Sequence, residues 1–327
     1  MTDHAIVESP LQFITAVEAL QDSSDALIHW RDDATGMSAF MASYRPEWLP
    51  AGVRTQAGLP DRTIATDGRL LLGDLCSGRI QMQLADAYLM RRLPQVVILD
   101  DGLSTVAVIR QLMLGRLPVR RPRESVSPVR LPLSAFVSSR LRGLARKGRL
   151  TWFTALVTDQ SMRERVEASG LAVRTHRFEH TRALPAAEAP ATTTLVIGSS
   201  MVADGLVDER PYMAWVRAAA EDAPVTYYPH RREDPRLLAQ LANNPRISVE
   251  EPGLALELRL SVLPAGTRIL SLPSTAVLSL SLINPAAEVV VTAVPASWWL
   301  PTAPRAFRTS AQTFASELGG RSRRDRA

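Results

Sequence analysis

Short apolar runs alternate with amphipathic stretches along the chain, which predicts strands that alternate with helices. Val96–Leu99 is apolar at every position, as expected for a strand that is buried on both faces of a parallel sheet. Because strand, helix and strand follow one another closely, the sheet is predicted to be parallel. The strands predicted in the first half are Ala5–Val7, Ala26–Trp30, RLLLGD at residues 69–74, Val96–Leu99, Thr151–Leu156 and one near Val173.

Two stretches of the first half do not follow this alternation. Residues 45–67 are rich in proline and glycine, which break helices and strands, and they predict no regular element. Residues 116–148 are rich in proline, arginine and serine and show no steady hydrophobic period, which predicts a mobile, partly helical insertion.

The alternation starts again after residues 184–194, LPAAEAPATTT, which have the composition of a linker. Short strands are predicted there in TLVIG, VTYYP, ISVE, RILSL and EVVVTAV. A chain of 327 residues suits two domains, so we predict an α/β protein with two Rossmann-like, doubly wound domains that face each other across a cleft. The predicted parts are an N-terminal domain at 1–183, the linker at 184–194, a C-terminal domain at 195–308, and a helix with a basic tail at 309–327.

Composition and charge narrow the class of protein. The N-terminus lacks the features of a secretory signal, and no stretch reaches the roughly 18 apolar residues of a membrane helix. The single cysteine, Cys76, forms no internal disulfide, which fits a reducing cytosol. Basic residues concentrate between Arg110 and Arg149 and in the C-terminal RSRRDRA, where Glu124 and Asp325 are the acids. Such runs are usually solvated faces, but they also attract anionic glycans, acidic lipids or nucleic acid.

Polar turns follow most of the predicted strands. In open parallel sheets ligands bind beyond the carboxyl ends of the strands, so these turns hold the candidate binding residues. A helix that begins there also offers unpaired N–H groups and the positive end of its dipole, which suit phosphate. The turns are Glu8-Ser9-Pro10, Gly73-Asp74, Asp100-Asp101-Gly102, Gly198-Ser199-Ser200, Pro229–Glu233, Glu250-Glu251 and Pro273-Ser274-Thr275.

Three of these turns carry side chains with a chemical role. Asp100 and Asp101 repel each other, and burial would raise the proton affinity of one, which would then accept a proton from a hydroxyl nucleophile. In the alternative, Asp100 caps the helix and Asp101 is solvated. His230 follows an apolar strand and either holds a phosphate or is a surface histidine. Ser274 or Thr275 is expected to cap its helix with a hydroxyl that accepts a first-turn N–H.

Several common signatures are absent from the sequence. It has no Asp-x-Asp, no His-Glu-x-x-His and no Cys/His cluster at ligand spacing, so no metal is expected. It also has no Gly-x-Gly-x-x-Gly, Walker loop or Gly-x-Ser-x-Gly elbow, which disfavours kinase, dehydrogenase and hydrolase functions.

Three of the turns, taken together, resemble motifs of the bacterial sialyltransferase and polysialyltransferase families. These families share an Asp/Glu-Asp/Glu-Gly motif, a His-Pro motif and a Ser-Ser/Thr motif in that order. The matching segments are Asp100-Asp101-Gly102, His230 within YYPHRRE, and Ser274-Thr275 within LPSTAVLSL. The N-terminal VESPLQFITAVEA also resembles the opening of the polysialyltransferase-like family, whereas Arg231 stands where the His-Pro motif has proline.

The resemblance implies a GT-B glycosyltransferase that transfers sialic acid from CMP-sialic acid to a glycan hydroxyl, with inversion and without a metal or other cofactor. It implies that Asp100 is the general base, that Asp101 positions it or exchanges roles with it, and that His230 stabilises the departing phosphate. The implied donor-binding residues are Ser274, Thr275, Gly198, Ser199, Ser200, Arg231, Glu233 and Glu257, and the acceptor-side residues are Ser9, Gln12 and Asp74.

The sequence alone leaves other functions open. The same fold would serve CMP-Kdo or another nucleotide sugar as donor. A non-catalytic basic protein would instead use residues 110–149 and the C-terminal tail on nucleic acid or acidic membrane. No nucleic-acid module is recognisable, so no nucleic-acid partner is expected. The expected partners are a nucleotide-sugar donor and an anionic glycan or glycolipid acceptor in the cytoplasm, with a peripheral contact at the inner face of the cell membrane left open.

Overall fold

The computed structural model describes residues 1–60, 67–89, 95–115, 118–120, 128–155, 160–185, 190–251 and 253–324. The chain divides into two compact units, Met1–Leu184 (unit 1) and Pro185–Ala327 (unit 2), each with its own sheet. The division falls within the stretch predicted as a linker. Residues 186–189 of that stretch, residues 116–117 and 121–127 of the predicted insertion, and residues 325–327 of the basic tail lie outside the described residues.

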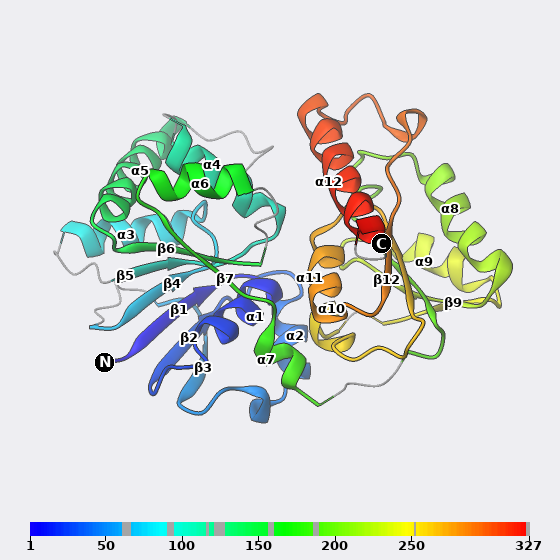
Figure 1. The fold of residues 1–327 in the computed structure, drawn as a ribbon, viewed down its shortest axis with the longest axis horizontal. Coiled ribbons are helices and arrows are strands. Elements are labelled where there is room, and N and C mark those ends of the chain that lie inside the picture. Colours follow the sequence, from blue (N-terminus) through cyan, green and yellow to red (C-terminus); the bar gives the residue numbers. More distant parts are fainter. Residues whose placement is uncertain are drawn as a thin grey trace. The chain divides into compact units, whose positions relative to one another are not determined.

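The sheet of unit 1 is parallel throughout and doubly wound (Figure 1). Its strands are β1 (Asp3–Val7), β2 (Ala26–Trp30), β3 (Val53–Ala57), β4 (Arg69–Leu72), β5 (Gln95–Ile98), β6 (Leu150–Thr154) and β7 (Ala172–Thr175). Their order is β3-β2-β1-β4-β5-β6-β7, so the direction of winding reverses between β1 and β4.

Helices cover both faces of this sheet. They are α1 (Pro10–Ala19), α2 (Met37–Ser43), α3 (Gly78–Leu89), α4 (Leu103–Leu114), α5 (Leu131–Arg146), α6 (Gln160–Ala168) and α7 (Glu179–Ala183), with the 3-10 turns η1 (Pro46–Trp48) and η2 (Pro128–Arg130). The helices α3, α4, α5 and α6 pack against one another on one face, and α1 and α7 pack together on the other (Figure 1).

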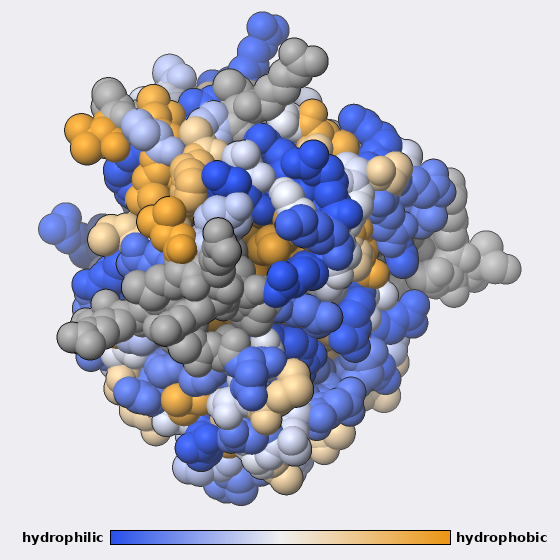
Figure 2. Space-filling model, turned by 90° about the vertical axis from the view of Figure 1, so that its left-hand side faces the viewer, coloured by the Kyte–Doolittle hydropathy of each residue, from blue (hydrophilic) through white to orange (hydrophobic). Residues whose placement is uncertain are grey.

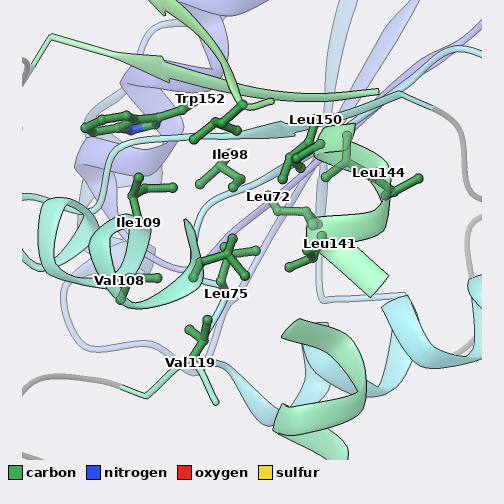
Figure 3. Close-up of a cluster of buried hydrophobic side chains, with 14 of the residues drawn as sticks. Leu72, Leu75, Ile98, Val108, Ile109, Val119, Leu141, Leu144, Leu150 and Trp152 are labelled. Carbon is green, nitrogen blue, oxygen red and sulfur yellow. The ribbon is translucent and has the colours of Figure 1, made fainter. Parts of the chain in front are cut away.

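A buried hydrophobic cluster holds α4 and α5 against the sheet of unit 1. Leu72, Ile98 and Trp152, from neighbouring strands, face Ile109 of α4 and Leu141 of α5, and all five side chains are almost fully buried (Figure 3). Burial of each such side chain contributes about 1.5–3 kcal/mol. The cluster therefore fixes the ends of β4, β5 and β6, where the candidate residues of unit 1 lie.

Unit 2 repeats the same architecture with a smaller parallel sheet. Its strands are β8 (Thr194–Ile197), β9 (Val225–Tyr228), β10 (Ile247–Val249), β11 (Arg268–Ser271) and β12 (Glu288–Val291), in the order β10-β9-β8-β11-β12. Its helices are α8 (Glu209–Asp222), α9 (Pro235–Ala242), α10 (Leu256–Arg259), α11 (Thr275–Ile283) and α12 (Arg305–Arg324), with the 3-10 turn η3 (Ala296–Trp298).

Alternating side chains of β8 build a core on each face of the second sheet. Leu195 and Ile197 pack with Leu280 of α11, whereas Val196 between them packs with Val216 of α8. The buried apolar run Leu195–Ile197 of β8 is what a central parallel strand requires. The predicted α/β class with two doubly wound, parallel-sheet domains is confirmed, and the cleft expected between the domains stays a prediction.

The helix α5 corrects the predicted insertion at residues 116–148. Leu141 and Leu144 of α5 lie in the core, so residues 131–146 form a packed helix rather than a mobile segment. The Ser134 hydroxyl donates to the Val119 carbonyl at 2.6 Å, and the Ser138 hydroxyl accepts from the Val119 N–H at 3.0 Å. These two polar residues occupy buried positions of the helix, so the sequence does not show the regular spacing of apolar residues that predicts a helix.

The C-terminal helix α12 spans Arg305–Arg324, so it begins before the predicted helix and basic tail at 309–327 and includes part of that tail. It packs against β12, and Ala311 and Phe307 join the core of unit 2. Among the helices of the described residues, none is both long and apolar enough to cross a membrane.

Candidate active site

Each sheet has one point where the winding reverses, and polar residues border both points. In unit 1 the reversal between β1 and β4 is bordered by Ser9 and Asp74, which follow these two strands. In unit 2 the reversal between β8 and β11 is bordered by Gly198 and Ser274. Ligands of open α/β sheets bind in the crevice beyond the strands at such a point. Both edges are therefore candidate binding sites.

Asp100 is buried beyond the carboxyl end of β5, with 2% of its surface exposed. The Trp152 indole N–H donates to its Oδ1 at 3.3 Å, and the Ala155 backbone N–H donates to its Oδ2 at 2.7 Å. Burial raises the pKa of Asp100 to about 7, although hydrogen bonds from Thr154, Ala155 and Trp152 lower it in part, and the charge of Asp101 adds to the rise. Asp100 thus joins β5 to β6 and offers no exposed oxygen to a substrate.

His176 is a buried neighbour of Asp100 that the sequence analysis did not single out. Its Nε2 lies 3.9 Å from Oδ2 of Asp100, and its ring stacks on Phe153 with the centroids 4.6 Å apart. Its Nδ1 accepts the Phe178 N–H at 3.4 Å, and burial lowers the pKa of His176 to about 4. The neutral ring therefore carries its proton on Nε2, the atom that faces Asp100.

Asp101 is the partly exposed acid of the pair. The Ser9 hydroxyl donates to its Oδ1 at 3.3 Å, and its own N–H donates to the Thr105 hydroxyl at 2.6 Å. Together with Gly73 and Asp74 it lines a small hollow of about 10 Å³ beyond the ends of β4 and β5, one strand away from the reversal point of unit 1. Of the two acids, Asp101 is the one that a substrate hydroxyl at this edge can approach.

Two of the three residues predicted to contact the acceptor are buried and hold the backbone instead. The amide oxygen of Gln12 accepts the Glu8 N–H at 2.7 Å, and a Cβ at Gly73 would lie 2.0 Å from that oxygen. The carboxylate of Asp74 accepts the Cys76 N–H at 2.8 Å. Gln12 and Asp74 are 1% and 4% exposed, so they shape the turns after β1 and β4. The third residue, Ser9, accepts the Gln12 N–H as the N-cap of α1.

In unit 2, Glu233 is buried at the centre of a hydrogen-bond network, and its predicted contact with the donor stays a prediction. Its Oε1 accepts the hydroxyls of Tyr227 at 2.5 Å and Tyr212 at 3.0 Å, and its Oε2 accepts the His230 N–H at 2.7 Å. Burial raises the pKa of Glu233 despite these donors. A Cβ at Gly198 would lie 2.3 Å from Oε2, so only glycine fits beside this carboxylate. The network fixes the turns after β8 and β9.

His230 lies half-buried in the turn after β9. Its Nδ1 accepts the Arg232 N–H at 3.2 Å, which leaves Nε2 as the donor of the neutral ring. Burial lowers the pKa of His230 to about 4, and the charges of Arg232 and Arg231 lower it further. His230 therefore acts at neutral pH as an N–H donor and not as a cation.

A cluster of polar side chains surrounds the turn after β8. Arg232 donates to the Ser200 hydroxyl at 3.0 Å and pairs with Asp204 at 2.8 Å. Ser199 is buried, and its hydroxyl accepts the Met201 N–H at 3.3 Å. Arg231 is exposed beside this cluster. The predicted donor-binding residues Gly198, Ser199 and Ser200 thus share one turn, and Arg232 is a member that the sequence analysis did not assign.

Ser274 occupies the N-cap position of α11 with extended backbone angles, but its hydroxyl makes no capping hydrogen bond, which corrects the predicted cap. The hydroxyl oxygen is buried and has no hydrogen-bond partner. The first turn of α11, which begins at Thr275, contains no acidic residue. The amino end of α11 therefore presents a buried hydroxyl and a positive dipole end without a negative side chain of its own.

Glu257 of α10 also differs from its predicted donor-binding role. It is 6% exposed and accepts the Ser279 hydroxyl of α11 at 2.9 Å, and burial raises its pKa. Its carboxylate therefore joins α10 to α11 rather than facing a ligand.

Among the described residues, one group of two glutamates and a histidine has ligand atoms close enough to one another to hold a metal ion. These are Glu18, His176 and Glu179, whose atoms lie within 4.8 Å of one another. The Glu18 carboxylate, however, accepts the N–H groups of His180 at 3.0 Å and Thr181 at 2.8 Å. These bonds cap α7 from α1, so the group has a structural role that needs no ion.

Comparison with known proteins gives little beyond the fold. No family model and no curated protein matches the sequence. Among solved structures, the chain is similar to E. coli heptosyltransferase WaaC with ADP, at 10% identity and a TM-score of 0.43 over 98% of this chain and 99% of that chain. It is also similar to the same enzyme with ADP-2-deoxy-2-fluoro heptose, at 11% identity and a TM-score of 0.40 over 97% and 100% of the two chains. Similarity at this level is too low to transfer either ligand or activity to this chain.

Proposed function

We propose that the chain is a glycosyltransferase that binds the phosphate of a nucleotide-sugar donor at the reversal point of unit 2. The observation that carries this proposal is the buried, unpartnered hydroxyl of Ser274 at the amino end of α11. A buried polar group without a partner costs about 1–3 kcal/mol, which a ligand that bonds to the hydroxyl recovers. Phosphate suits this position because the adjacent N–H groups and the helix dipole favour an anion.

The turns on either side support the same ligand. The strand β8 lies between β9 and β11, so His230 and Ser274 follow strands about 10 Å apart, two strand spacings. The residue between them, Gly198, packs against the Glu233 carboxylate, which fixes the turn after β8 between the two groups. A phosphate above β8 therefore lies within reach of the Ser274 hydroxyl and the Nε2–H of His230.

In unit 1 we assign the general base to Asp101 and a positioning role to Asp100, the exchange of roles that the sequence leaves open. Asp101 is partly exposed beyond the end of β5, whereas Asp100 is buried and hydrogen-bonded by Trp152 and Ala155. A pKa of about 7 keeps Asp100 partly protonated at neutral pH, which lessens its repulsion of Asp101. His176, behind Asp100, is assigned to orient it.

The proposed reaction is a direct displacement. The acceptor oxygen forms a bond to the anomeric carbon as the bond from that carbon to the donor phosphate breaks, and the acceptor proton goes to Asp101. The negative charge that develops on the departing nucleotide is stabilised by Ser274, the N–H groups of α11 and the Nε2–H of His230. A base and a phosphate site of this kind suffice for the transfer, so the proposal includes no metal or other cofactor.

For the donor we propose CMP-sialic acid, with an anionic glycan or glycolipid as acceptor. The support is the resemblance to sialyltransferases of the motifs at Asp100-Asp101-Gly102, His230 and Ser274-Thr275. CMP-Kdo and other nucleotide sugars are the alternative donors, because the phosphate site contacts no sugar.

A nucleotide screen tests this function. We expect CMP to raise the melting temperature of the full-length protein more than UDP, GDP or ADP does, and labelled CMP-sialic acid to release CMP when a glycan acceptor is present. A larger shift with another nucleotide would change the donor and leave the glycosyltransferase proposal standing. If no nucleotide or nucleotide sugar shifts the melting temperature, the proposed function is wrong.

A further inference from the structure

The outer side of the helices α3 and α5 in unit 1 carries exposed aliphatic side chains. Met82 and Leu89 of α3 are 59% and 69% exposed, and Val129 of η2 and Leu131, the first residue of α5, are 86% and 40% exposed. We call these four residues, with Arg130 and Arg140, the α3–α5 surface. Figure 2 looks onto the outer side of unit 1 and shows apolar side chains gathered at its upper left beside strongly polar ones. Exposed aliphatic residues that cluster in this way mark an interaction surface.

The two helices hold this surface together as one piece. Arg130 donates to the Cys76 carbonyl just before α3, and Arg140 donates to the Tyr88 hydroxyl at 2.8 Å near the end of α3. The Arg140 guanidinium also lies over the rings of Tyr88 at 4.2 Å and Phe136 at 4.9 Å. The opposite side of α5 is buried in the core of unit 1, so the exposed side chains stand on a fixed support.

The sequence that contains α5 is rich in basic residues. Eleven arginines and lysines and a single acid, Glu124, occur between Arg110 and Arg149, although the net charge of the whole chain is only +5. On α3 the exposed Asp86 lies between Met82 and Leu89, and Arg79 of the same helix is also exposed. The surface therefore combines aliphatic side chains with the exposed arginines Arg130 and Arg140, within a basic part of the sequence.

We propose that the α3–α5 surface docks on an anionic lipid bilayer. Aliphatic side chains gain free energy when they enter the acyl boundary of a bilayer, and arginines beside them are attracted to anionic headgroups. A second copy of the chain would place two cationic surfaces against each other, which is unfavourable. Single-stranded nucleic acid binds through stacked aromatic side chains, whereas the exposed residues here are aliphatic. The docking does not depend on the proposed enzymatic function.

Co-sedimentation with lipid vesicles tests this docking on the full-length protein. We expect binding to vesicles of phosphatidylcholine mixed with phosphatidylglycerol, weaker binding as salt is raised, and little binding to phosphatidylcholine alone. The triple variant Met82→Ser, Leu89→Ser and Val129→Ser should bind the mixed vesicles at least about tenfold more weakly, because each lost side chain contributes through its buried area. Arg130→Gln should weaken binding about fivefold, as one cation near the surface does.

Two matched variants in unit 2 serve as controls. Val262→Ser removes an aliphatic side chain that is 48% exposed, and Arg236→Gln removes an exposed arginine, and both should bind as the wild type does. Equal binding of the triple variant and the wild type would overturn the proposal, as would equal binding to vesicles with and without phosphatidylglycerol. The proposal would also be overturned if the wild type bound duplex DNA but no vesicles. The same holds if the wild type bound no vesicles and formed a dimer that the triple variant dissociates.

Discussion

The strand-end edges of the two units have the same topology but opposite chemistry. In unit 1 the residues beyond β1, β4 and β5 include the acids Asp74, Asp100 and Asp101. In unit 2 the residues beyond β8, β9 and β11 provide donors, namely the Ser274 hydroxyl, the Nε2–H of His230 and the amino end of α11. One edge is suited to accepting a proton and the other to binding an anion.

The two edges also differ in how far the protein satisfies its own polar groups. Asp100 has both oxygens hydrogen-bonded within the protein, whereas the Ser274 hydroxyl has no partner. A satisfied group supports its neighbours, while an unsatisfied buried group is stabilised only when a ligand supplies the partner. The difference distinguishes Asp100 from Ser274 and does not extend to His176, whose buried Nε2 also has no hydrogen-bond partner. The following substitutions test the roles assigned to both edges.

The largest effect is expected from Asp101→Asn. If Asp101 is the general base, its loss should slow sugar transfer by about 10²–10⁴-fold, because a positioned base contributes a factor of this size. CMP affinity, measured by calorimetry, should stay unchanged, since the phosphate is assigned to unit 2. Asp22→Asn, at an exposed aspartate of unit 1, is the matched control. Undiminished transfer by the Asp101→Asn variant would remove Asp101 from the mechanism.

Asp100→Asn should change the pH dependence of stability. The pKa of this carboxyl rises from 3.8 to about 7 on folding, so the folded state keeps a proton that the unfolded state loses. The proton on Asp100 therefore stabilises the folded state fully below pH 4. This contribution to the free energy of unfolding falls by about 1.4 kcal/mol per pH unit as the pH rises towards 7. Asparagine does not ionise, so the free energy of unfolding of the variant relative to wild type should rise over this range.

The difference between variant and wild type is the quantity to measure, because His176 acts in the opposite direction. Its pKa is lowered to about 4, so it adds stability as the pH rises through its ordinary range. Urea unfolding at several pH values gives the difference directly. A difference that does not vary between pH 4 and 7 would contradict the buried, proton-retaining state of Asp100.

Glu233→Gln should destabilise unit 2 by about 2 kcal/mol. The carboxylate accepts hydrogen bonds from two tyrosine hydroxyls through one oxygen and from the His230 N–H through the other. Glutamine replaces one of these oxygens with an NH₂ group, which cannot accept a hydrogen bond, so a buried donor is left unpaired. Urea unfolding measures the change, and Glu209→Gln, at an exposed glutamate of α8, is the control. Unchanged stability with lost CMP binding would instead support the direct donor contact that the sequence predicts.

His230→Ala should weaken CMP binding by about tenfold, the loss of one charge-assisted hydrogen bond, and slow transfer as well. The neutral ring donates through Nε2, so His230 should add no transition near pH 6.5: CMP affinity of wild type and variant should follow the same pH profile, that of the CMP phosphate, whose second pKa is about 6. Calorimetry with CMP across this pH range measures both effects. Normal CMP affinity in the variant would refute the phosphate role of His230.

The smallest effect on the free energy of unfolding is expected from Ser274→Ala. Its hydroxyl makes no capping bond, so alanine should not reduce the free energy of unfolding, although CMP binding should weaken by about tenfold. Ser9→Ala is the informative contrast, because Ser9 does cap its helix and its loss should cost about 1 kcal/mol. A stability loss at Ser274 equal to that at Ser9 would show that Ser274 is an ordinary cap.

Much of the fold is predictable from the sequence because central parallel strands are apolar at every position. This holds for Val96–Leu99 and for Leu195–Ile197 of β8, which the apolar runs locate closely. The edge strand β3 escapes the sequence analysis, because most of Val53–Ala57 is exposed and polar. The helix α5 escapes it because Ser134 and Ser138 occupy buried positions.

The candidate site is predictable as a set of turns but not as a set of roles. Sequence order places Asp100 and Asp101 together, yet only the packing of β6 against β5 shows that Asp100 is the buried one. Likewise, Glu233 is buried by tyrosines from β9 and α8, which no local pattern reveals. His176 follows the edge strand β7 and reaches Asp100 across β6, so sequence spacing carries no signal for the pair.

A crystal structure of the full-length protein with CMP tests the phosphate site at the start of α11 most directly. We expect phosphate oxygens within hydrogen-bond distance of the Ser274 hydroxyl and of the first N–H groups of α11, with the Nε2 of His230 turned towards the same phosphate. A nucleotide bound away from β8 and β11, with the Ser274 hydroxyl still unpaired, would contradict the proposed donor site.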